Sequence, residues 1–129
     1  MTAVNTRNFY IDQVQDVTVI CFTVSTIVER NYEQVSDELF EIIEYLSANG
    51  AFQIVVDLFS VRQIDDWGLA TLRAFHETIE TNRGTVIFSR ITSAVADIIN
   101  EAEFGDAFPT RKTRSEAIGA FRDLSAATR

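Results

Sequence analysis

Short runs of apolar and β-branched residues recur along the chain and predict the strands of a sheet. These runs are Phe9–Val14, Val17–Val24, a run ending at Asp57 that contains Ile54, Val55 and Val56, Thr85–Phe88, and a brief segment at Phe108-Pro109. Only Gln15-Asp16 separates the first two runs, which predicts a hairpin with a tight turn. The second run, VTVICFTV, is apolar or β-branched on both faces, so it predicts an interior strand. The proline favours an edge position for the last segment, because proline cannot donate a ladder hydrogen bond.

Apolar residues spaced three or four positions apart occupy the stretches between these runs and predict four helices. The apolar stripes are Val35, Leu39, Ile42 and Leu46; then Leu69, Leu72, Phe75 and Ile79; then Val95, Ile98 and Ala102; then Ala117, Ile118, Phe121 and Leu124. Asn49-Gly50, Asn82-Arg83-Gly84 and Phe104-Gly105 are typical of helix ends. A hydroxyl residue that can cap a helix, Thr92 or Ser93, indicates where the third helix starts, and Ser115 indicates where the fourth helix starts.

Helices that alternate with strands imply parallel strand pairs, and the opening hairpin makes the sheet mixed. The pattern therefore predicts one α/β domain over residues 1–129, with a core from about 8 to 124. It predicts a mixed, mostly parallel sheet of about 4–5 strands packed with about four helices.

Composition narrows the classes of partner. The chain has 129 residues, of which 47% are hydrophobic, and a formal net charge of −8. That charge argues against nucleic acid and against an anionic membrane surface, because both require clustered Lys and Arg. The single cysteine, Cys21, allows no intrachain disulfide and no zinc site built from several cysteines. We expect it to be a small, buried apolar side chain. No apolar run approaches a membrane span and no signal-peptide core precedes the domain, so we expect a cytoplasmic protein.

Candidate chemistry is sparse. Asp57, Asp65 and Asp66 lie at a strand end and at the following helix start, and could form a carboxylate cluster. The single histidine, His76, lies beside an apolar helix stripe and reads as a helix-flank residue. No nucleophile elbow or phosphate-binding glycine loop occurs, so we expect no catalytic residue, no metal and no cofactor. The alternative is a small α/β ligand-binding protein or enzyme that uses the three carboxylates.

The helix after Ile64 begins with two acids and a tryptophan. Asp65 or Asp66 is expected to cap this helix and to complement its dipole. Two positions are open for the Trp67 side chain, since an aromatic residue in a first helical turn either folds onto the core or projects as an interface anchor.

The stretch FQIVVDLFSVRQIDDWGL, residues 52–69, resembles the core of a STAS domain, a module named for sulphate transporters and anti-sigma-factor antagonists. That family typically reads D-L-S-x-V-x-x-[ILM]-D-S-S/T-G-L. The residues that match it are Asp57-Leu58, Val61, Ile64-Asp65 and Gly68-Leu69. The resemblance continues more weakly from about Phe9 to about Phe121. Phe59 stands where the family often has serine, and Trp67 replaces a small hydroxyl residue.

The resemblance implies a STAS-like fold and a regulatory role through protein binding. The implied partner is an anti-sigma-factor-like kinase or another regulatory protein in a bacterial cell, with a homodimer as a further alternative. The implied partner-binding residues are Asp65, Asp66, Trp67, Gly68 and Leu69. Asp66 occupies the position of the phosphorylatable Ser or Thr. It carries a charge there without being phosphorylated, which predicts phosphorylation-independent behaviour.

Overall fold

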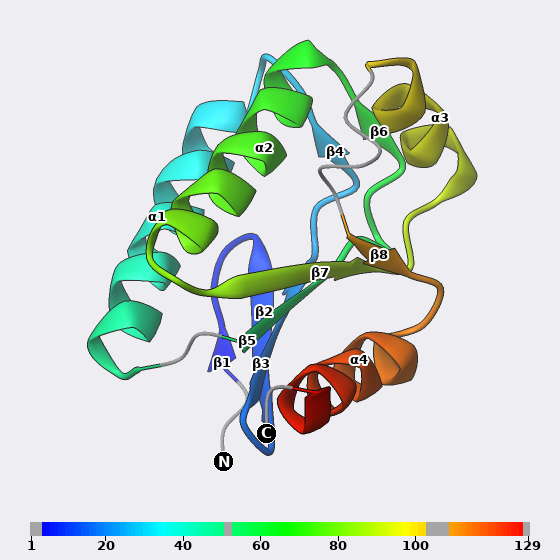
Figure 1. Ribbon diagram of the computed structural model, residues 1–129. Helices are drawn as coiled ribbons and strands as arrows, with labels where there is room; N and C mark the ends of the chain where they lie inside the picture. The colour runs from blue at the N-terminus through cyan, green and yellow to red at the C-terminus, as the bar shows by residue number, and fades with distance from the viewer. Residues whose placement is uncertain (1–3, 51–52, 103–108, 128–129) are drawn as a thin grey trace.

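The computed structural model describes residues 4–50, 53–102 and 109–127, which form a six-stranded sheet, a separate pair of short strands and four helices (Figure 1). The main sheet has the order β1-β2-β3-β5-β7-β8. Its strands are β1 (Val4–Asn5), β2 (Phe9–Val14), β3 (Val17–Phe22), β5 (Gln53–Asp57), β7 (Thr85–Ser89) and β8 (Thr110–Arg111).

The strand pairings confirm a mixed, mostly parallel sheet. β1, β2 and β3 pair antiparallel, whereas β3, β5, β7 and β8 pair parallel. The hairpin turn between β2 and β3 lies at Gln15, which has a φ of 56°. The carboxyl ends of β3, β5 and β7 therefore meet at one edge, where Cys21 pairs with Asp57 and Asp57 with Ser89.

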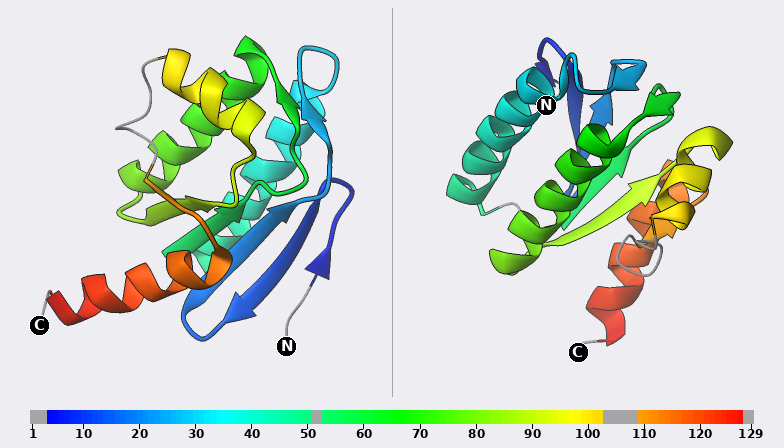
Figure 2. Two further views of the ribbon diagram at one scale, coloured as in Figure 1. Left: turned by 90° about the vertical axis from the view of Figure 1, so that its right-hand side faces the viewer. Right: turned by 90° about the horizontal axis from the view of Figure 1, so that it is seen from above.

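Helices cover both faces of the sheet. They are α1 (Tyr32–Ala48), α2 (Asp66–Thr81), α3 (Ser93–Glu101) and α4 (Arg114–Ala127). Figures 1 and 2 show α1 and α2 side by side on one face and α4 on the other. Within the described residues, no helix is long and apolar enough to cross a membrane.

The alternation of side chains along each strand produces two separate cores. Ile54 and Val56 of β5 belong to the larger core, which also contains the buried stripes of α1 and α2. Val55 belongs to the smaller core beneath Ala117 and Phe121 of α4. The same alternation directs Asp57 toward the α4 side of the sheet.

Several element limits differ from the sequence prediction. β3 ends at Phe22 instead of Val24. The fully buried residues of α3 are Val95 and Ile99, while Ile98 and Ala102 are only partly buried. The edge strand lies at Thr110–Arg111, immediately after the proline.

The last helix begins at Arg114 instead of Ser115, because the hydroxyl of Thr113 accepts a hydrogen bond from the N–H of Glu116 at 3.0 Å. Thr113 is thus the residue that caps α4. Phe104-Gly105, Phe108 and the side chain of Leu124 lie outside the described residues.

The sequence pattern did not predict the second, smaller sheet. β4 (Thr26–Ile27) and β6 (Gln63–Ile64) pair parallel just before the start of α2. Gly68 of α2 packs directly on this pair: a Cβ added there would meet the carbonyl oxygen of Ile27 and lie 2.6 Å from Cγ1 of Ile64. The absence of a side chain at Gly68 lets the helix start lie against the β4 backbone.

We predict that Gly68→Ala destabilises the domain by about 1–3 kcal/mol, because the added methyl group overlaps backbone that cannot easily move. The matched control is Gly119→Ala in α4, where an added Cβ has no neighbour within 4 Å. This control should be stabilising by up to about 1 kcal/mol, since alanine is the better helix former. Urea unfolding of both variants measures the difference. Equal stabilities of the two variants would contradict the close packing at Gly68.

Candidate functional site

Asp65 organises the start of α2. Its backbone is extended, with φ −115° and ψ −169°, as is typical of an N-cap. Its Oδ1 accepts hydrogen bonds from the N–H groups of Trp67 and Gly68, both at 3.0 Å. Its Oδ2 accepts a third from the N–H of Glu29 at 2.9 Å, in the loop that follows β4. The cap prediction is therefore confirmed for Asp65, which also ties the helix to a segment far away in sequence.

These hydrogen bonds hold Asp65 in its charged form. Desolvation acts to raise the pKa of the carboxyl group, but the N–H donors of Glu29, Gly68 and Trp67 outweigh it and lower the pKa below the usual value of 3.8. The negative charge at the positive end of the helix dipole is thus retained throughout the neutral range.

Asp66 and Trp67 face solvent on the first turn of α2. The Trp67 side chain remains 47% exposed and stacks on Tyr32 of α1, with ring centroids 4.7 Å apart and an interplanar angle of 25°. The two alternatives for Trp67 thus resolve in favour of projection, although one face of the indole is covered. Gly68 and Leu69 are buried and fix the helix to the domain instead of facing outward.

The predicted cluster of three carboxylates does not form. Asp57 is only 1% exposed and lies at the end of β5, on the side of the sheet that faces α4. Asp65 is engaged by backbone N–H groups at the helix start. Within the described residues, no group of three or more His, Cys, Asp and Glu side chains could hold a metal ion. The acids therefore have different surroundings: Asp57 is buried in the sheet, whereas Asp65 accepts hydrogen bonds at the helix start.

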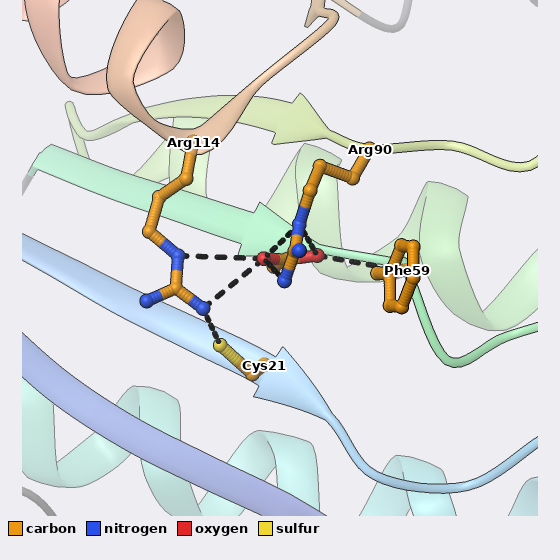
Figure 3. Close-up of polar contacts among 5 residues, drawn as sticks. Cys21, Phe59, Arg90 and Arg114 are labelled. Carbon is orange, nitrogen blue, oxygen red and sulfur yellow. Dashed lines mark hydrogen bonds and ion pairs between the residues drawn. The ribbon is translucent and has the colours of Figure 1, made fainter.

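Two arginines neutralise Asp57 (Figure 3). Arg90 donates from Nε to both carboxylate oxygens, at 3.1 and 2.9 Å, and its Nη2 lies 2.7 Å from Oδ2. Arg114 donates from Nη2 to Oδ2 at 3.2 Å. The hydrogen bonds to Asp57 raise the pKa of Arg90 above its usual value, so the guanidinium stays charged. Sequence reasoning missed this arrangement, because 33 and 57 residues separate the arginines from Asp57.

The surroundings of Cys21 and His76 differ partly from those predicted from the sequence. Cys21 is only half-buried, and its sulfur accepts a hydrogen bond from Nη2 of Arg114 at 2.9 Å. Burial is the largest influence on this thiol and raises its pKa. His76 lies on α2 but is buried, with Nε2 3.1 Å from Oε1 of Glu80.

We predict that Asp65→Ala destabilises the domain by about 1 kcal/mol, within the range of about 0.5–2 kcal/mol for a lost N-cap. The folded-state pKa of Asp65 lies below its unfolded value. Its contribution is therefore fully present above pH 3.8 and is lost as the pH falls below that value. Denaturant unfolding across the acid range should show the two proteins converging at low pH. Asp37→Ala, at an exposed position of α1, is the control and should show a smaller difference. A wild-type advantage that does not change with pH would contradict the role of a charged cap.

Comparisons with known proteins agree with this fold. Residues 10–117 match the family described as the STAS domain. A putative anti-sigma factor antagonist from Thermotoga maritima is 20% identical, with a TM-score of 0.78 and coverage of 90% of this chain and 96% of that chain. An anti-sigma-factor antagonist (STAS) domain protein from Planctomyces limnophilus is 17% identical, with a TM-score of 0.71 and coverage of 90% and 98%. The Bacillus cell fate determinant SpoIIAA in its phosphorylated form is 16% identical, with a TM-score of 0.60 and coverage of 88% and 98%.

No curated protein matches the sequence. At these identities, the likeness to solved structures concerns the fold, which is that of anti-sigma-factor antagonists. The matched range includes Asp65, Gly68 and Leu69, which build the start of α2. Because the match spans most of its length, this chain belongs to the STAS domain family.

Proposed function

We propose that this protein is a non-enzymatic regulatory module that binds a protein partner through the exposed start of α2. We call this the α2 surface and define it by Tyr32 together with Asp65, Asp66 and Trp67, supported from beneath by Gly68 and Leu69. The partner is an anti-sigma-factor-like kinase or another regulatory protein in a bacterial cytoplasm. The family and the fold of the bacterial neighbours support this class of function.

The stacked pair of Trp67 and Tyr32 is the observation that carries the proposal. Interface anchors are most often Trp, Tyr and Arg side chains. Trp67 is half exposed, yet its stacking on Tyr32 limits the rotamers it can adopt in the free protein. An anchor that is ordered before binding loses less conformational entropy when the complex forms.

The rigidity of the helix start supports the same proposal. The three hydrogen bonds to Asp65 and the contact of Gly68 with the β4 backbone fix the position from which Trp67 projects. Acidic residues are the chain neighbours of the stacked pair: Asp66 precedes Trp67, and Glu33 follows Tyr32. Both acidic side chains are exposed. The matching partner surface is therefore expected to offer Lys or Arg beside an apolar recess.

Asp66 makes phosphorylation-independent binding the simplest form of this proposal. It stands where the family resemblance expects a phosphorylatable hydroxyl, on the exposed side of the first turn. A carboxylate there gives a fixed single charge, smaller than the charge of a phosphoserine, which is about −1.5 to −2. The partner would thus meet the same surface irrespective of kinase activity.

We predict that Trp67→Ala weakens partner binding by about 30-fold or more, corresponding to the loss of a hot spot of about 2 kcal/mol. The partner is first identified by affinity capture with the wild-type protein, then purified, and its Kd is measured for each variant. Tyr45→Ala is the matched control, because Tyr45 is the most exposed large hydrophobic residue in the described part of the chain, at 68%, and lies on α1 outside the α2 surface. Similar Kd values for both variants would place the binding surface elsewhere. A self-associating wild-type protein that Trp67→Ala renders monomeric would identify a second copy as the partner.

We further predict that Asp66→Ser changes the Kd for the same partner while lowering stability by at most about 1 kcal/mol. The small stability effect is expected because Asp65, not Asp66, caps the helix, so only a dipole interaction is lost. The change in binding is expected to be a weakening if the partner offers the cation described above. The measurement is the ratio of Kd values, with the urea midpoint as the control for folding. Unchanged binding would reduce Asp66 to a solvated surface charge.

A further inference from the structure

A row of polar side chains crosses the carboxyl edge of the main sheet. Asp57 and Ser89 are the last residues of β5 and β7, and Cys21 is the last but one residue of β3; the three are register neighbours, so they point to the same face. That face is the one covered by α4, and the first residue of α4, Arg114, reaches the row. This place is distinct from the α2 surface, because α1 and α2 lie on the opposite face of the sheet (Figure 2).

Positive charge exceeds negative charge at this row. One buried carboxylate, Asp57, forms ion pairs with two guanidinium groups, so these three side chains together carry one unit of positive charge. Arg111 and Lys112 lie in the segment leading into α4, where Glu116 is the acidic residue of the first turn. This local excess is notable in a chain whose net charge is −8. An anion bound at this edge of the sheet would balance the local excess of positive charge.

The two guanidinium groups are held in fixed positions but retain free donors. Asp57 binds both, and Arg90 also stacks on Phe59 with its Cζ 4.5 Å from the ring centroid. Their side chains are 37% and 34% exposed. Among the described residues, Nη1 of neither Arg90 nor Arg114 has a hydrogen-bond partner. Arg90 has a φ of 54°, in the left-handed region, and its side chain reaches Asp57 at the end of β5.

Ser89 provides a second, independent observation. Its hydroxyl is fully buried, and it is the only buried side-chain N or O atom among the described residues that lacks a hydrogen-bond partner. A buried hydroxyl without a partner is destabilising and therefore unusual. Ser89 lies one strand spacing, about 4.8 Å, from Asp57 and points to the same face of the sheet.

We propose that this edge is a binding site for a small oxyanion of the phosphate class, contacted by Arg90 and Arg114 with Ser89 as an additional donor. Planar guanidinium groups bind tetrahedral oxyanions through pairs of parallel hydrogen bonds. The N-terminus of α4 adds its positive dipole end on the same side. In doubly wound sheets, the carboxyl ends of the strands are also the usual place for ligands. A tetrahedral oxyanion suits these donors better than chloride does, because its several oxygens can accept hydrogen bonds from the guanidinium and hydroxyl groups together.

The test is a titration of the full chain with inorganic phosphate above neutral pH, at constant ionic strength set with sodium chloride. The readouts are Tm and the NMR signals of the arginine Nε–Hε groups. We expect a saturable rise in Tm, together with shifts of the Arg90 and Arg114 signals. Sulfate should act similarly, because it is also a tetrahedral dianion, whereas chloride alone should not. An equal effect of chloride would reduce the result to ionic strength and would overturn the proposal.

Three variants locate the site. Arg114→Met should bind phosphate at least tenfold more weakly, whereas Arg73→Met, which removes a cation from the surface of α2, should bind like the wild type. Ser89→Ala should also weaken binding, but without lowering Tm in the absence of phosphate, because the hydroxyl has no partner to lose. Arg114→Lys preserves the charge and serves if Arg114→Met fails to fold; it should bind with intermediate affinity. Wild-type phosphate binding in Arg114→Lys and Ser89→Ala would overturn the proposal.

Discussion

The burial of the Asp57 carboxylate is the constraint on which the rest of the structure depends. An isolated charge at that position would be strongly unfavourable, and removing one member of such a buried pair typically costs about 3–5 kcal/mol. The neutralising groups come from Arg90, just beyond β7, and from Arg114, at the start of α4. Satisfying one acid therefore fixes where two other segments must lie. It also explains why α4 begins directly over the carboxyl edge of the sheet.

The same constraint separates the three acids of the family-like motif into three roles. Side-chain alternation in β5 places Asp57 on the α4 side, where it becomes a buried counter-ion. The chain then passes through β6 to the opposite side, where Asp65 caps α2 and Asp66 faces solvent. Acids that lie eight or nine positions apart in sequence thus never share a site, and their proximity in the motif reflects local folding requirements instead of joint chemistry.

The features that sequence predicted are those encoded by local periodicity. The stripe of α2 and the uninterrupted β5 run repeat over several residues, so their element types follow from pattern alone. The strands β4 and β6 have only two residues each, which is too few to show a period. Trp67 illustrates the limit at the site: its position in the first helical turn was clear, but stacking on Tyr32 depends on how α1 and α2 pack. The pairing of Asp57 with Arg114 was likewise invisible, because only the complete sheet brings them together.

Geometry and chemistry are separable at the start of α2. Asp65 and Gly68 produce the shape of the helix start through hydrogen bonds and close packing, and neither requires a particular residue at position 66 or 67. Those two outward positions carry a fixed charge and an indole, which are the groups that a partner bound at the proposed α2 surface would meet. A fixed charge cannot act as a switch. If the α2 surface binds its partner as we propose, the charge at position 66 does not turn that complex on or off. The guanidinium pair at the opposite face of the sheet is a second candidate site, held by Asp57 at the end of the strand that precedes β6 and α2.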